Sequence, residues 1–200
     1  MLYRSSSPID PSQGERRFAA DDLLWEAGVV TAVNTSDCRF RFRNFKGYRD
    51  THYAALGERN QVALNMGHDY PSDAFLEDMY NGLDFLSERP GPYLIHGTEG
   101  VERTGYVCMV LEALMGASKE ELLEDYLRSY EEYYRYEPDS DGWKAAERQA
   151  VSNLLTFTGA ADEASLGALD LAQATRTYLL EQVGLSAEQI DLIVAHLSNP

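Results

Sequence analysis

The sequence predicts an α/β fold, with a central sheet flanked by helices and a helical layer at the C-terminal end. Apolar runs rich in β-branched residues alternate with helical patterns in the first half of the chain, and only helical patterns follow later. Between the two, an apolar run at 92–95 leads through a short polar segment into a helix. With 200 residues, we expect a single domain made of an α/β core over 1–135 and a helical extension over 136–200.

The first half of the chain contains the strands of the predicted sheet. Strands are expected at 3–7, 29–35, 61–66 and 92–95, and helices at 21–27 and 73–88. Gly28 ends the first helix, because glycine readily takes the left-handed conformation found there. Ser72 is a typical N-cap for the second helix. The apolar side chains on one face of that helix are Phe75, Met79, Leu83 and Leu86.

The second half of the chain is predicted to be helical throughout. Helices are expected at 104–115, 119–134, 143–157, 169–183 and 187–197. Two of them begin at a capping box, formed by Ser118 with Glu121 and by Ser186 with Gln189. A loop at 159–165 separates the third of these helices from the fourth.

Composition restricts the partners and the compartment of the chain. Its formal net charge of −16 opposes binding to nucleic acid or to anionic lipid. No apolar stretch approaches the ~18 residues that cross a membrane, and the first residues lack the apolar core of a signal peptide. The cysteines, Cys38 and Cys108, indicate neither a disulfide framework nor a metal site, and Cys108 is expected to pack in a buried helix. We therefore predict a cytoplasmic protein, with a secreted mature form as the open alternative.

One segment departs from this acidic composition. Residues 39–49 carry five basic side chains and no acidic one, and Arg alternates with Phe through the first part. The alternation has the period of a strand, so we predict a strand with phenylalanines on one face and arginines on the other. We expect these arginines to pair with some of the many surface carboxylates. The alternative is a positive rim that attracts an anionic substrate to a pocket.

Residues 96–105 form the most informative motif. They lie between a predicted strand and the N-terminus of a helix, an arrangement that directs backbone N–H groups and the helix dipole at an anion. Arg103 can bind two oxygens of that anion with its planar guanidinium group. Gly100 and Gly105 permit the close approach of backbone to ligand that such a loop requires. The sequence therefore predicts a phosphate-binding loop.

The same residues resemble the signature loop of the protein tyrosine phosphatase superfamily, His-Cys-x5-Arg-Thr/Ser-Gly. Each fixed position is matched except the nucleophilic cysteine, where this chain has Gly97. Segments 3–6, 27–34, 92–134 and 178–186 are further similar to a bacterial branch of atypical tyrosine phosphatases. The resemblance implies a tyrosine phosphatase-like α/β fold, with a central mixed sheet flanked by helices, and a reaction that needs no cofactor.

The resemblance also implies roles for the matched residues. In this superfamily the cysteine attacks phosphorus as a thiolate and carries the phosphoryl group. Arg103 matches the residue that binds the equatorial oxygens and stabilises the transition state. Thr104 matches the hydroxyl that assists the thiolate, and His96 matches the residue that sets the loop and the thiolate pKa. The residues expected to surround the phosphate are Thr98, Glu99, Gly100, Val101, Glu102 and Arg103.

A general acid must protonate the leaving oxygen, and the resemblance implies an aspartate on a separate loop. Asp69 is our first choice, because it precedes a predicted helix on a loop that can close over a substrate. Asp73 is the second, although its place in the first turn of that helix already has an explanation in the helix dipole. Glu102 is the third, since the myotubularin branch places its acid immediately before the signature arginine.

Gly97 decides the predicted outcome, because glycine supplies no nucleophile. The chain is predicted to be an inactive variant of a phosphotyrosine phosphatase that still binds phosphate, sulfate or phosphotyrosine, including the phosphotyrosine of a phosphoprotein. Glu99 and Glu102 repel polyanions, which favours a monoester such as phosphotyrosine. The alternative is a natural pseudophosphatase that serves as a phosphate-binding module. Both an engineered and a natural origin of Gly97 stay open.

Tyrosines cluster on the predicted helix at 119–134. The residues at helical spacing are Tyr126, Tyr130, Tyr133 and Tyr134, and Tyr136 follows them. Packing against the rest of the fold is the first explanation of such a stripe. The alternative is an interaction protein that uses this aromatic helix as its contact surface.

Overall fold

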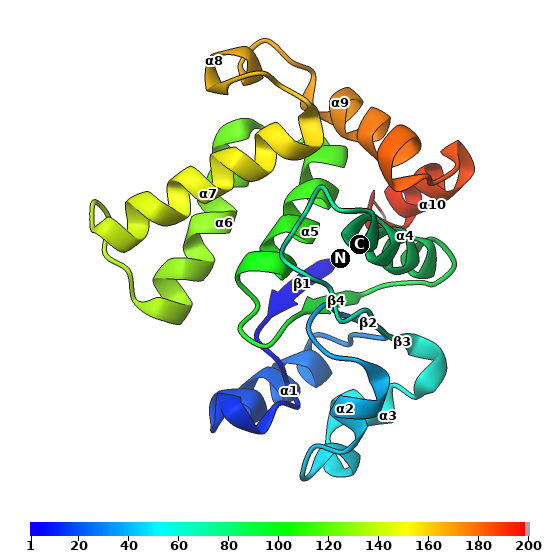
Figure 1. The fold of residues 1–200 in the computed structure, drawn as a ribbon. Helices are drawn as coiled ribbons and strands as arrows, with labels where there is room; N and C mark the ends of the chain where they lie inside the picture. The colour runs from blue at the N-terminus through cyan, green and yellow to red at the C-terminus, as the bar shows by residue number, and fades with distance from the viewer. Residues whose placement is uncertain (199–200) are drawn as a thin grey trace.

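The computed structural model describes residues 1–198 and contains one parallel sheet (Figure 1). Its strands are β1 (Leu2–Ser5), β2 (Thr31–Asn34), β3 (Gln61–Ala63) and β4 (Tyr93–His96). Their order is β1-β4-β2-β3, so β4 lies in the interior of the sheet between β1 and β2. The predicted α/β class is confirmed. The four described strands all run parallel, where a mixed sheet was expected.

Helices occupy most of the described chain outside the sheet. The α-helices are α1 (Arg16–Glu26), α2 (Arg39–Arg43), α3 (His52–Ala55), α4 (Asp73–Ser87), α5 (Glu102–Leu114), α6 (Lys119–Tyr134), α7 (Asp141–Thr158), α8 (Glu163–Leu166), α9 (Leu171–Tyr178) and α10 (Ala187–Ser198). Shorter turns are η1 (Pro11–Gln13), η2 (Tyr48–Asp50), η3 (Glu58–Asn60) and the π-helical turn η4 (Leu179–Val183).

The predicted elements are present with some changes in their ends. Each predicted strand is shorter or shifted, and the first helix begins at Arg16, earlier than expected. The helix expected at 169–183 changes to π geometry for its last turn, and α8 begins inside the loop expected at 159–165. Both predicted capping boxes form, with Ser118 and Ser186 as the caps.

Apolar side chains cover both faces of the sheet. Val33 and Ile95 point to one face and Ala32 and Leu94 to the other, because successive side chains of a strand alternate. The first face is covered by α4, α5 and the C-terminal helices, and the second by α1, α2 and α3 (Figure 1). Burial on both faces is typical of parallel sheets.

Helix α5 is the centre of the larger apolar layer. Ten of its 13 residues are buried, because the sheet, α6 and α9 all pack against it. Gly105 lets the ring of Tyr126 approach the helix, since a Cβ there would lie 2.7 Å from the ring. Cys108 is buried as expected, and burial raises the pKa of its thiol to about 12, so the thiol stays protonated.

The strand predicted within residues 39–49 is wrong, because this segment begins with helix α2. Residues two apart point in different directions on a helix, and Phe40 is accordingly 82% exposed. Phe42 is buried under the sheet, and Phe45 packs beside it. Arg43 lies 2.8 Å from Glu58, and Arg39 lies 4.0 Å from the same carboxylate. The arginines therefore pair with carboxylates, the arrangement favoured from the sequence.

Phe157 of α7 connects the C-terminal helices to α5. Its ring is 1% exposed and lies edge-on to Tyr106 at 6.0 Å and tilted to Tyr178 at 6.1 Å. We expect Phe157→Ala to lower the free energy of unfolding by about 3–5 kcal/mol, since the change removes a buried ring and leaves a cavity. Urea unfolding measures this loss, with the exposed Ser152→Ala on the same helix as the control. A loss below about 1 kcal/mol would contradict this packing.

Candidate active site

The segments that follow the four strands meet at the carboxyl ends of the sheet. The backbone N–H of Thr35 after β2 donates to the carbonyl of His96 at the end of β4, at 2.8 Å. The N–H of Met66 after β3 donates to the Thr35 carbonyl at 2.8 Å, and the N–H of Ser7 after β1 donates to the Thr98 carbonyl at 3.0 Å. Segments far apart in the sequence thus form one site at the edge of the sheet where α/β proteins commonly bind ligands.

The loop 97–101 connects β4 to α5 and is fixed at Gly100. This glycine has a φ of +77°, and a Cβ on it would lie 2.2 Å from the carbonyl oxygen of Ser5. No residue with a side chain fits there without displacing backbone. Gly100 therefore holds the loop against the end of β1, as the predicted phosphate loop requires.

Arg103 lies in the first turn of α5 and is half-buried. Its Nη1 donates to the carbonyl oxygen of Met66 at 2.7 Å, which ties the arginine to the segment between β3 and α4. Arg103 therefore links the first turn of α5 to the segment between β3 and α4. An anion at this end of the helix meets the helix dipole and a fixed positive charge together.

His96 ends β4 and is fully buried, with the ring of Tyr53 edge-on to it at 5.0 Å. Burial lowers the pKa of its imidazole to about 4, and neither ring nitrogen has a hydrogen-bond partner among residues 1–198. The ring is therefore neutral at pH 7 and adds no positive charge to the site. Its carbonyl also accepts a hydrogen bond from the Thr35 hydroxyl at 3.1 Å, which joins β4 to the loop after β2.

Gly97 is buried, and three hydroxyl groups surround the place where a side chain would begin. A Cβ at this position would lie 2.8 Å from Oγ1 of Thr104, 2.9 Å from Oγ of Ser36 and 2.9 Å from Oγ1 of Thr35. These contacts are all with the ends of side chains. A cysteine at 97 therefore needs small movements of these hydroxyls, with no displacement of backbone.

Thr35 and Ser36 lie beside Gly97, and neither they nor Asp37 were among the predicted site residues. The side-chain oxygen of Asn34 accepts hydrogen bonds from the backbone N–H groups of Ser36 at 2.9 Å and Asp37 at 3.1 Å, which turns the chain after β2. Their sequence signal was a polar run directly after an apolar strand. That signal points to a site only once β2 and β4 are known to be neighbours.

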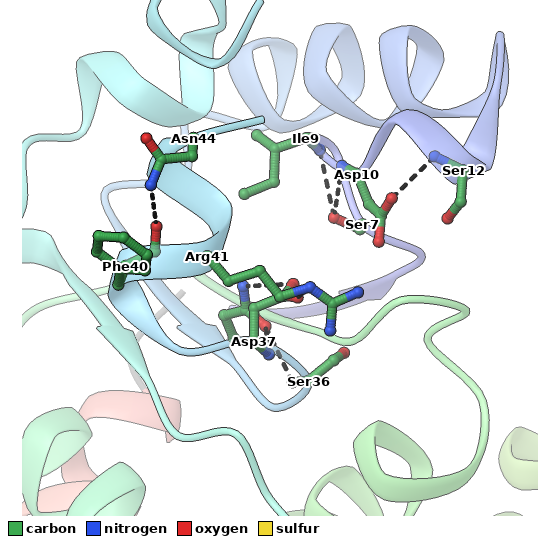
Figure 2. Close-up of polar contacts among 10 residues, drawn as sticks. Ser7, Ile9, Asp10, Ser12, Ser36, Asp37, Phe40, Arg41 and Asn44 are labelled. Carbon is green, nitrogen blue, oxygen red and sulfur yellow. Dashed lines mark hydrogen bonds and ion pairs between the residues drawn. The ribbon is translucent and has the colours of Figure 1, made fainter. Parts of the chain in front are cut away.

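Asp37 brings a buried carboxylate next to the site. Its Oδ1 lies 3.3 Å from Nε of Arg41, and its Oδ2 accepts a hydrogen bond from Nδ2 of Asn34 at 3.3 Å. Burial raises the pKa of Asp37, while Asn34, Arg41 and Arg103 oppose the shift. Figure 2 shows the side chain of Arg41 lying beside Asp37. Arg41 therefore offsets a buried negative charge that would otherwise repel an anion.

The aspartates considered as general acid lie on one loop and on the helix that follows it. Asp69 is exposed, three residues after the Met66 carbonyl that binds Arg103. Asp73 is exposed in the first turn of α4, which the Ser72 side chain caps. The structure thus ties the segment that carries Asp69 to the arginine through Met66, and it places Asp73 in the first turn of α4.

We call the loop 97–101 together with the first two residues of α5 the loop 97–103. Its two acidic residues contact side chains of other segments. Glu102 is exposed in the first turn of α5, and its carboxylate lies 3.5 Å from Nε2 of His68. Glu99 accepts a hydrogen bond from the hydroxyl of Tyr134 in α6. Helix α6 therefore holds the outer side of the loop.

The aromatic residues of α6 pack within the fold. Tyr126 and Tyr130 are buried, with their ring centroids 5.5 Å apart. Tyr133 donates a hydrogen bond to the side chain of Gln13 at 3.1 Å. The ring of Tyr136 stacks on Tyr134 at 5.3 Å. These tyrosines therefore pack within the fold, which is the first explanation that the sequence suggested.

A family model described as tyrosine phosphatase family matches residues 42–199. The chain belongs to the tyrosine phosphatase family. The match includes the loop 97–101 and Arg103, and it spans the segments 92–134 and 178–186. A comparison with curated proteins found no match. Within residues 1–198, no helix has the length and apolar character needed to span a membrane, and no three His, Cys, Asp or Glu side chains are grouped as metal ligands.

The loop 97–101 packs tightly against the Ser5 carbonyl at Gly100. We expect Gly100→Ala to lower the free energy of unfolding by at least about 2 kcal/mol, since the methyl group meets the Ser5 carbonyl and φ stays positive. Gly116→Ala is a matched control, because Gly116 has a φ of +89° with nothing within 4 Å of an added Cβ. Thermal or urea unfolding compares the two variants. Equal losses would show that the contact with Ser5 contributes nothing.

Proposed function

We propose that this member of the tyrosine phosphatase family binds phosphomonoesters, above all phosphotyrosine, in the loop 97–103 and does not hydrolyse them. Loop amides and Arg103 would act on the oxygens of the phosphoryl group at the N-terminus of α5. The observation that supports this most directly is the placement of Arg103, held by the Met66 carbonyl beside a loop fixed at Gly100. Inorganic phosphate and sulfate have the same tetrahedral oxygens and are expected to compete.

Gly97 is the reason for the proposed lack of turnover. The family uses a thiolate at this position, and the hydroxyls that surround it here are weak nucleophiles at neutral pH unless a base activates them. Without the thiolate, a bound phosphate dianion also escapes repulsion from a like charge about 3–4 Å away. Binding is therefore expected to be as strong as in a cysteine-containing form, or stronger.

The acidic residues of the loop support phosphotyrosine over polyanionic phosphates. Glu99 and Glu102 are both exposed at its outer side, where further phosphate groups of a polyanion would come close to them. The arginines of α2 do not offset this charge, because Arg39 and Arg43 are paired with Glu58. A single phosphate ester on an aromatic ring avoids this repulsion.

In a cysteine-containing form we assign Asp69 as the general acid, with Asp73 and Glu102 as the alternatives. The assignment is supported by the loop of Asp69, which reaches the arginine through Met66. Thr104 would assist the thiolate, and His96 would hold the loop as a neutral ring.

We also propose that residues 1–135 and 136–200 act as one domain. The two cysteines are free, which supports our proposal that the protein works in a reducing cytoplasm.

A natural pseudophosphatase is the second candidate function. It is supported by the hydroxyls of Thr35, Ser36 and Thr104, which close to within 2.9 Å of the missing Cβ. A pocket adapted to a cysteine would leave more room there, since Cβ contacts under 3.0 Å are essentially never seen. In this case the protein holds a phosphorylated partner and protects it from hydrolysis.

Removal of the arginine tests the binding site. We expect Arg103→Ala to weaken binding of a phosphotyrosine peptide roughly 100-fold, because a charge-assisted, two-oxygen contact is lost. Arg103→Lys keeps the charge and loses the planar fork, so an intermediate loss is expected. Calorimetry measures both, with the exposed Arg128→Ala as a control of equal charge change. If Arg103→Ala binds as well as the unchanged protein, the ligand is bound elsewhere.

Restoring the nucleophile tests whether this chain is an inactivated form of an active phosphatase. We expect Gly97→Cys to raise aryl phosphate hydrolysis on the order of a thousandfold or more above the unchanged chain, with inhibition by vanadate. Gly97→Ser is the matched control, because it adds a side chain of similar size without a thiolate. A folded Gly97→Cys variant with no activity would favour the pseudophosphatase over an inactivated enzyme.

A further inference from the structure

Ser36 has a feature that the phosphatase chemistry described above does not use. Its side chain is 5% exposed, and its Oγ is buried with no hydrogen-bond partner among residues 1–198. The same atom lies 2.9 Å from the point where a Cβ at Gly97 would be. Buried hydroxyls in folded proteins nearly always have a partner, so this one calls for a ligand atom.

The neighbouring hydroxyls already use their protons. The hydroxyl of Thr35 donates to the His96 carbonyl at 3.1 Å. Its Oγ1 also lies 3.2 Å from Oγ1 of Thr104, and because a hydroxyl has one proton, Thr104 must be the donor in that pair. Ser36 therefore offers the one uncommitted O–H group of the three.

We propose that Ser36 is a further oxoanion-binding residue, which donates a hydrogen bond to an oxygen of the bound phosphate beside Gly97. The proposal rests on phosphate binding by the loop 97–103 and adds a contact from the loop after β2. We define the hydroxyl floor as the side chains of Thr35, Ser36 and Thr104. The hydroxyl floor binds one oxygen of a phosphate, sulfate or phosphomonoester group, while Arg103 binds other oxygens of the same group.

The position of the hydroxyl floor supports a ligand shared with Arg103. Thr104 follows Arg103 directly in the first turn of α5, so the floor and the guanidinium group lie at the same helix end. The backbone of Ser36 is fixed by the Asn34 side chain, which leaves the hydroxyl as the part free to turn toward a ligand. The active family has a cysteine at position 97, and the proposal places a ligand oxygen on the same side of Gly97, where the Ser36 hydroxyl can donate to it.

Calorimetry with inorganic phosphate tests this contact. We expect Ser36→Ala to weaken phosphate binding about tenfold or more, because a hydrogen bond to a charged group is lost. The exposed Ser152→Ala is the control and should bind like the unchanged protein. The Ser36 side chain has no partner within the described chain, so the thermal midpoint of Ser36→Ala should be close to that of the unchanged protein.

A second variant makes the test independent of how Ser36→Ala folds. Gly97→Ala places a methyl group within 2.9 Å of the three hydroxyls and so fills the hydroxyl floor. We expect this variant to bind phosphate more weakly, and the further change Ser36→Ala to have little effect in its background. Such non-additivity in a double-mutant cycle is the signature of two changes that act on one contact.

The outcomes separate this proposal from the proposed function. If the unchanged protein binds no phosphate, the proposed function fails as well. A different result would separate the two proposals: the unchanged protein binds phosphate, Arg103→Ala abolishes binding, and Ser36→Ala and Gly97→Ala bind like the unchanged protein. The proposed contact of Ser36 would then be wrong, while phosphate binding by the loop 97–103 would be retained. In that case the partner of the Ser36 hydroxyl would be a water molecule, and the ligand would not contact this hydroxyl.

Discussion

The site depends on the parallel pairing of β4 between β1 and β2. Because neighbouring strands run in the same direction, the segments that follow them leave the sheet at one edge and contact each other there. Backbone hydrogen bonds from Thr35 to His96 and from Ser7 to Thr98 join these segments at 2.8 Å and 3.0 Å. The loop 97–101 is therefore fixed on both sides by backbone, and its shape does not rely on the side chain at position 97.

This independence means that the loop can keep its shape although position 97 is a glycine. Gly100 fits against the Ser5 carbonyl, and Arg103 is held by the Met66 carbonyl, so neither contact involves Gly97. The chain has a net charge of −16, and two features limit the negative charge beside the site. Arg41 offsets the buried Asp37, and the neutral His96 adds no charge. The positive end of α5 and Arg103 are left as the attraction for an anion.

Local patterns in the sequence predicted the elements and the loop well. Ser72, Ser118 and Ser186 mark helix starts because a cap is a short-range interaction, and the strand–loop–helix order around Gly97 is equally local. The contacts of Ser36 and Asp37 could not be predicted, since they depend on strand order. The alternation at 39–43 was misleading because its two phenylalanines do not share one face: Phe42 is buried and Phe40 is exposed. The choice among Asp69, Asp73 and Glu102 depends on how a loop closes over a ligand.

The most direct test of the central claim is to follow backbone amide resonances during a titration with O-phosphotyrosine. If the loop binds the phosphoryl group, the largest changes should fall on the amides of residues 97–103, which point at the anion. Smaller changes should follow in the neighbouring segment 35–37. Saturable changes confined to another surface, or none at millimolar ligand, would contradict the account.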